Sequence, residues 1–266
     1  LLADLGQQIE LPFDMHIQGI HGTNWQYQAI NTKGESEFEV KVSSADLLAD
    51  ATGDNVQLQT LSVTSSLGEV QAKGQIQLQA DFPLQLNINA DLNRLKQKET
   101  VLLPATKANL TLSGTLKKQT ALLLQTQGAI DAELKAEAQL TAPKTPLNVK
   151  LAVARGQYPF DGNDPLSIKD VNLTINGDIL TSQIQLNGAV SGMGIPANSL
   201  DLQAIGHLSN IEIHQLKLNA LEGSAELKGD VNWRDGVEWN SHLQLAKMNL
   251  GRYLSAFPAV LSGELS

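Results

Sequence analysis

The sequence predicts an all-β fold, a long and mostly antiparallel sheet curled into an elongated, open hydrophobic groove. Between residues 70 and 92 nearly every even position is apolar or small, and the odd positions carry mostly Gln, Asn, Asp, Glu or Lys. Successive strand residues point to opposite faces, so this period of two indicates one apolar and one polar face. The same alternation recurs over residues 130–140 and 200–208.

Alternation also predicts short strands near the start of the chain, and one segment among them favours a helix. Residues 11–17 and 38–42 alternate in the strand pattern. Residues 44–52 read SADLLADAT, in which Ser44 is suited to cap a helix and the following Ala and Leu residues are good helix formers. We therefore expect one short helix near 44–52, with the sheet resuming at Val56.

The chain is expected to form one continuous module rather than separate domains. Residues 1–155 form the first stretch of sheet, and residues 156–165, rich in Gly, Pro, Asp and Asn, form a linker or loop. Residues 166–266 continue the same repetitive sheet. Within them, Asn176-Gly177 is a typical hairpin turn signal.

Two stretches of the chain align without a gap. Residues 61–76 read LSVTSSLGEVQAKGQI, and residues 216–231 read LKLNALEGSAELKGDV. Each pattern indicates a strand, a tight turn at glycine and a second strand. A hairpin is therefore predicted to be the building unit, because repeats that bury only one face stack into arrays.

Composition excludes several classes of function. The 266 residues carry a net charge of −9, whereas nucleic-acid partners require a basic surface. The chain has no cysteine, which excludes disulfides and thiolate metal sites. No run of about eighteen apolar residues is present, so we expect no transmembrane segment. The chain lacks an initiating Met and is expected to be an internal piece of a longer protein.

Catalytic motifs are also missing from the sequence. None of the five histidines pairs with another at a metal-ligand spacing. There is neither a nucleophile elbow nor a phosphate-binding loop. We therefore expect no catalytic residue, no metal, no cofactor and no enzymatic activity.

The long apolar face is the remaining candidate for function. Its tracts exceed the five or six residues usual for a strand, and it mixes Leu and Ile with Ala and Gly, which fill a closed core poorly. A closed sandwich core would show the same alternation, but an open groove of this composition suits acyl chains. The residues expected to face the groove are Ile76, Leu78, Leu86, Ile88, Leu134, Leu173, Ile175, Leu186, Leu218, Leu227 and Val231.

The pattern resembles the TamB family of AsmA-like bridge proteins of Gram-negative envelopes. The resemblance is carried by residues 173–192, LTINGDILTSQIQLNGAVSG, and residues 216–239, LKLNALEGSAELKGDVNWRDGVEW. It implies a β-taco sheet in the periplasm that moves phospholipid between the inner and outer membranes. It further implies inner-membrane anchoring and a TamA-like outer-membrane β-barrel partner, both through parts of the protein outside this fragment.

Two other functions remain open from the sequence. One is a chaperone-like groove that holds outer-membrane protein strands by edge pairing during their assembly. The other is a structural or adhesive β-solenoid, although the strand spacing is irregular for one. The sequence does not separate the chaperone from the lipid conduit, since both need the same apolar wall.

Overall fold

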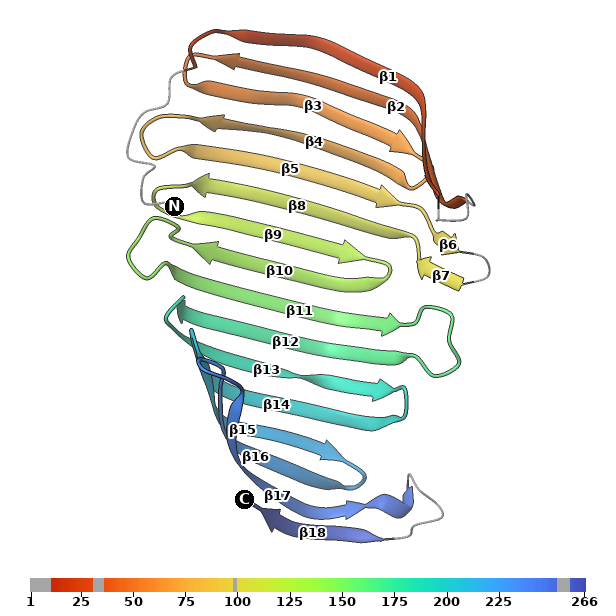
Figure 1. Ribbon diagram of the computed structural model, residues 1–266, viewed down its shortest axis with the longest axis vertical. Coiled ribbons are helices and arrows are strands. Elements are labelled where there is room, and N and C mark those ends of the chain that lie inside the picture. The colour runs from red at the N-terminus through yellow and green to blue at the C-terminus, as the bar shows by residue number, and fades with distance from the viewer. Residues whose placement is uncertain (1–10, 31–35, 98–99, 253–258) are drawn as a thin grey trace. The chain divides into compact units, whose positions relative to one another are not determined.

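The chain forms β-strands along almost all of its described length. The computed structural model describes residues 11–30, 36–97, 100–252 and 259–266, shown in Figure 1. In these ranges the one helical element is a single 3₁₀ turn, η1 (Leu250–Arg252). The chain divides into two compact units, unit 1 (Leu1–Ala129 and Gln139–Ala142) and unit 2 (Ile130–Ala138 and Pro143–Ser266).

Unit 1 contains an antiparallel sheet whose neighbouring strands follow one another along the chain. The strands of unit 1 are β1 (Met15–Ile30), β2 (Ser36–Thr52), β3 (Asn55–Ser65), β4 (Gly68–Gln77), β5 (Pro83–Leu92), β6 (Leu95–Gln97), β7 (Thr100–Leu103), β8 (Thr106–Thr115) and β9 (Thr120–Gln127). Strands β6 and β7 form a separate two-stranded sheet, so in the main sheet β5 pairs with β8.

Unit 2 continues with antiparallel strands that also pair in chain order. Within the described strands of either unit, the first strand does not pair with the last, so each sheet is open. The strands are β10 (Ile130–Ala138), β11 (Pro146–Tyr158), β12 (Leu166–Asp178), β13 (Thr181–Gly192), β14 (Ile195–His207), β15 (Asn210–Ala220), β16 (Gly223–Asn232), β17 (Glu238–Asn249) and β18 (Val260–Leu265).

The predicted all-β, antiparallel class is confirmed, and the predicted helix near 44–52 is wrong. Residues 44–52 form the second half of β2, which pairs with β1 on one side and with β3 on the other. Ala45, Leu47, Ala49 and Ala51 alternate with Asp46, Leu48 and Asp50, a nearly regular two-faced pattern with a register shift at Leu48. Ladder hydrogen bonds on both sides outweigh the weak local helix preference of Ala and Leu.

Two predicted connections fall at slightly different places in the structure. In the segment 156–165, residues 156–158 still belong to β11, and the turn comprises residues 159–165. The expected turn at Asn176-Gly177 lies three residues later, at 179–180. The carboxylate of Asp178 accepts hydrogen bonds there from the backbone N–H groups of Leu180 (2.8 Å) and Thr181 (2.9 Å), which fixes the turn.

The internal repeat corresponds to two hairpins of the same register, one in each unit. The β3–β4 hairpin closes with Ser65 opposite Gly68, and the β15–β16 hairpin closes with Ala220 opposite Gly223. Each first strand has a register shift at the equivalent place, over residues 58–61 and 213–216. The matched sequences therefore encode a matched β-bulge, which bends a strand and increases its twist.

A mid-strand glycine lies beside each of these bulges. A Cβ at Gly74 would lie 2.5 Å from the carbonyl oxygen of Gln85, and one at Gly229 would lie 2.1 Å from that of Asn240. Only glycine allows the next strand to approach so closely. Both copies of the repeat thus contain the bulge and the close approach that bend the sheet at this point.

We predict that Gly229→Ala destabilises the chain by on the order of 1–3 kcal/mol, because the added methyl group overlaps the backbone of β17. Urea unfolding followed by circular dichroism measures the change. Gly263→Ala in β18 is the matched control, since its Cβ would meet nothing within 4 Å, and it should change stability by less than about 0.5 kcal/mol. Equal losses in the two variants would contradict the close-approach explanation.

Candidate functional site

A row of leucines crosses every strand of unit 2. Each leucine lies directly opposite the next one in the antiparallel ladders, so all of them share one face of the sheet. We call this set the leucine row. It comprises Leu134, Leu151, Leu173, Leu186, Leu202, Leu216, Leu227, Leu243 and Leu265.

Parallel apolar rows cross unit 1 in the same manner. One of them contains Ile20, Leu47, Leu61, Ala72, Ile88, Leu110 and Leu124, one residue from each strand of the main sheet. A neighbouring row places Leu86 between Gly74 and Leu112. Glycine in such a row leaves space between larger side chains.

The apolar face of unit 1 is hollowed at this glycine. A hollow of about 360 Å³ opens over β3, β4, β5 and β8. Its volume is within the range typical of small-molecule sites, and its lining is almost entirely aliphatic. The lining residues are Val56, Leu58, Gly74, Gln75, Ile76, Leu84, Gln85, Leu86, Leu112 and Leu116.

The eleven predicted groove residues fall into these rows or beside them. Ile76 and Leu86 line the hollow, Ile88 lies in the adjacent row, and Leu78 follows β4 at the start of a turn. Leu134, Leu173, Leu186 and Leu227 belong to the leucine row. The remaining three lie in flanking rows of unit 2, where Ile175 is opposite Ile184, Leu218 opposite Leu200 and Val231 opposite Ile211.

Several members of the rows were not predicted individually. Leu151, Leu202, Leu216 and Leu243 belong to the leucine row, and each has the apolar phase of its own strand. Alternation identifies their face, but only the strand register shows that they lie opposite one another.

All eleven predicted residues are half-buried, which distinguishes this face from a closed core. The fully buried apolar residues of the described chain are few and mostly small: Ala51, Ala72, Phe82, Val101, Val153, Ala204 and Ala220. A second layer packed on either sheet would bury the leucines completely. Within each unit, the described residues therefore place no second layer over the apolar face.

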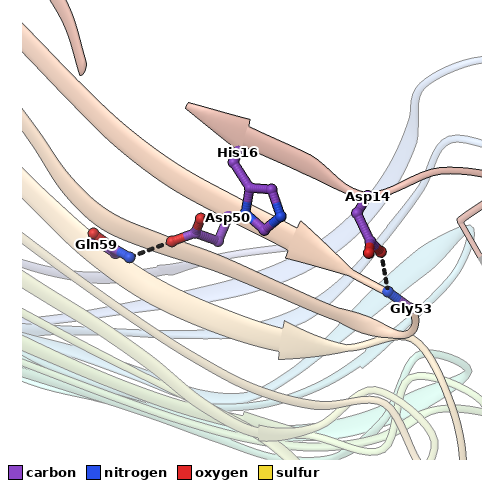
Figure 2. A network of polar contacts seen from close by, with 5 residues as sticks. All are labelled: Asp14, His16, Asp50, Gly53 and Gln59. Carbon is purple, nitrogen blue, oxygen red and sulfur yellow. Dashed lines mark hydrogen bonds and ion pairs between the residues drawn. The ribbon is translucent and has the colours of Figure 1, made fainter. Parts of the chain in front are cut away.

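The opposite face carries polar side chains that pair across strands. Figure 2 shows such a network on β1, β2 and β3. His16 Nδ1 lies 2.9 Å from a carboxylate oxygen of Asp50, and Gln59 donates a hydrogen bond to the same carboxylate. Nearby, the backbone N–H of Gly53 donates to Asp14 over 3.2 Å. These exposed pairs suit a face in contact with water.

On β16 of unit 2, the Lys228 ammonium lies 3.2 Å from a carboxylate oxygen of Glu226 and donates a hydrogen bond to it. This hydrogen bond holds the pKa of the Glu226 carboxyl below its ordinary value.

The described residues contain no group of three His, Cys, Asp or Glu side chains placed to hold a metal ion. Among the elements described, no helix is long and apolar enough to cross a membrane.

Comparison with known proteins gives a family match across the whole chain. The family profile described as "TamB, N-terminal domain" matches residues 1–266. The translocation and assembly module subunit TamB of Haemophilus influenzae is 45% identical over 260 residues, which are 97% of this chain. The match spans 20% of that relative's length, about a fifth. No solved structure matches the chain significantly.

We predict that truncating a leucine of the apolar face lowers the free energy of unfolding far less than truncating a buried core side chain does. Phe82 is 1% exposed, lies under the Lys117 ammonium at 4.9 Å, and Phe82→Ala should cost about 3–5 kcal/mol. Leu86→Ala should cost about 1 kcal/mol, because Leu86 borders the open hollow. Chemical unfolding of both variants measures the contrast. A cost of about 2–5 kcal/mol for Leu86→Ala would indicate a closed core.

Proposed function

The chain belongs to the TamB family, and from this premise we propose that it is a periplasmic segment of a bridge-like protein. In this proposal its apolar face forms a hydrophobic groove through which phospholipid moves between the inner and outer membranes. The full-length protein is anchored in the inner membrane and works with a TamA-like outer-membrane β-barrel through another part of its chain. The segment itself performs no catalysis.

The uncovered apolar face is the observation that supports this proposal most strongly. Leucines that lie opposite one another across nine strands, and a hollow lined by aliphatic side chains, suit flexible hydrocarbon chains. Transferring an acyl chain of about sixteen carbons out of water is worth on the order of 12 kcal/mol, at about 0.8 kcal/mol per methylene. A lined groove avoids that cost for a lipid that crosses the periplasm.

The lining of the hollow also favours acyl chains over a compact polar ligand. Two lining residues, Gln75 and Gln85, have polar side chains, and the remaining lining residues offer no side-chain hydrogen bond. A sugar or nucleotide needs several oriented polar partners and aromatic stacking surfaces. An acyl chain needs only contact area.

A second function draws support from the name of the Haemophilus influenzae relative, a translocation and assembly module subunit. A groove of this kind could hold strands of outer-membrane proteins by edge pairing while they await assembly. Both functions use the same apolar face, so the experiment must identify whether lipid or protein binds to it.

We predict that photo-crosslinking in cells captures phospholipid at Leu86 and Leu218 but not at Asn89 and Lys217. The first two face the apolar side, whereas the last two are exposed on the polar side. Gln85 is unsuitable as the control because it contributes to the lining of the hollow. Crosslinks to outer-membrane protein strands at the Leu positions would instead support the assembly function, and equal capture on both faces would reject a groove.

Substitutions on the apolar face and on the polar face are expected to differ in the same way. Leu86→Asp and Leu218→Asp place a carboxylate on the apolar face and should abolish transport or unfold the sheet. Asn89→Asp and Lys217→Asp should leave transport and folding nearly unchanged, since these side chains already face water. Lipid transfer between membranes together with circular dichroism provides the measurement.

A further inference from the structure

An exposed apolar surface follows one rim of unit 2, formed by the turns after β12, β14 and β16. In an antiparallel sheet, the turns after alternate strands lie at the same rim. Backbone contacts join neighbouring turns along it. The N–H of Ile179 donates to the carbonyl of Lys144 (3.0 Å), and the N–H of Trp233 donates to that of Ser209 (2.9 Å).

Six large apolar residues project from this rim, with 38–76% of their surface exposed. Trp239 pairs directly with Val231, and Trp233 and Leu208 follow Val231 and Gly206 by two residues, so they continue the apolar phase of their strands. We call these six residues the apolar lip. They are Ile179, Leu180, Leu208, Trp233, Val237 and Trp239.

The composition of the lip favours a bilayer surface as its partner. Tryptophan prefers the boundary between hydrocarbon and headgroups, because its ring is apolar and its N–H is polar. A stable protein partner would engage about 20–30 residues on each side, many more than the six of the lip. Insertion of a few side chains into a membrane interface needs no such area.

The charges beside the lip indicate which kind of bilayer. Lys144 and Arg234 lie at this rim together with Asp178, Asp235 and Glu238, so the rim has no excess of positive charge. Binding to anionic lipid depends on clustered Lys and Arg, at about 1 kcal/mol for each such residue near the surface. The rim therefore suits zwitterionic headgroups, and hydrophobic insertion supplies the attraction.

We propose that the apolar lip docks unit 2 edge-on to a zwitterionic lipid bilayer. The apolar rows cross the strands and therefore run parallel to this rim, so docking lays them alongside the membrane surface. This inference goes beyond the proposed function, because the lip can bind a bilayer whether or not lipid then moves along the leucine row.

Flotation of the full chain with phosphatidylcholine vesicles tests the docking. We expect the wild-type chain to float, and Val237→Ser with Trp239→Ser to weaken binding by on the order of tenfold. The matched control is Met193→Ser with Ile195→Ser, since these residues are also exposed but lie at the opposite rim of unit 2. The control pair should bind as the wild type does, and added phosphatidylglycerol should not strengthen binding.

Quenching of tryptophan fluorescence by brominated phosphatidylcholine locates the contact. A chain that retains only Trp239 (Trp25→Phe, Trp233→Phe) should be quenched.

Three outcomes would overturn the docking proposal: absence of flotation, equal weakening by the two double variants, or a self-association that the lip substitutions abolish without any vesicle binding. If the chain does not float but phospholipid still crosslinks at Leu218, the docking proposal is rejected and the groove proposal is supported. If the chain floats but no phospholipid crosslinks at Leu218, the groove proposal is rejected and the docking proposal is supported.

Discussion

The structure depends on the register of its antiparallel ladders, which keeps apolar residues opposite apolar residues from strand to strand. The leucine row exists because each hairpin of unit 2 pairs its strands without displacing this phase. A slip of one residue would turn a strand's leucines to the polar face and its charged residues to the apolar face. Each directly opposed pair contributes about 0.2–1 kcal/mol, so the rows stabilise the sheet and define its apolar face together.

The bulges and glycines change the local register and strand spacing but keep the apolar residues on one face. The register shifts at 58–61 and 213–216 let the apolar phase continue on both sides of a bend. Gly74 and Gly229 allow the next strand to come close at that bend, and Gly74 also lines the hollow of unit 1. In unit 1 the bend and the hollow of the apolar face thus share a glycine.

Much of the fold was predictable because alternation reports directly on strand structure. Alternation assigned the residues expected in the groove, from Ile76 to Val231, to one phase of the pattern, and their contact with a ligand stays a prediction. It did not identify which leucines meet, because pairing depends on turn positions and bulges that the pattern leaves undefined. The turn at 179–180 illustrates this, since the Asp178 carboxylate fixes it and the Asn176-Gly177 signal does not. The helix expected at 44–52 failed because local propensity took no account of pairing with β1 and β3.

The proposed groove requires the apolar face to admit a hydrocarbon chain. Spin labels at Leu202→Cys, in the leucine row, and at Gln203→Cys, on the polar face, probe this access, because the chain contains no other cysteine. Both labels should be mobile without lipid, and added phospholipid should slow only the label at residue 202. A label at residue 202 that is immobile before lipid is added, and unchanged afterwards, would show that the face is closed and forms no groove.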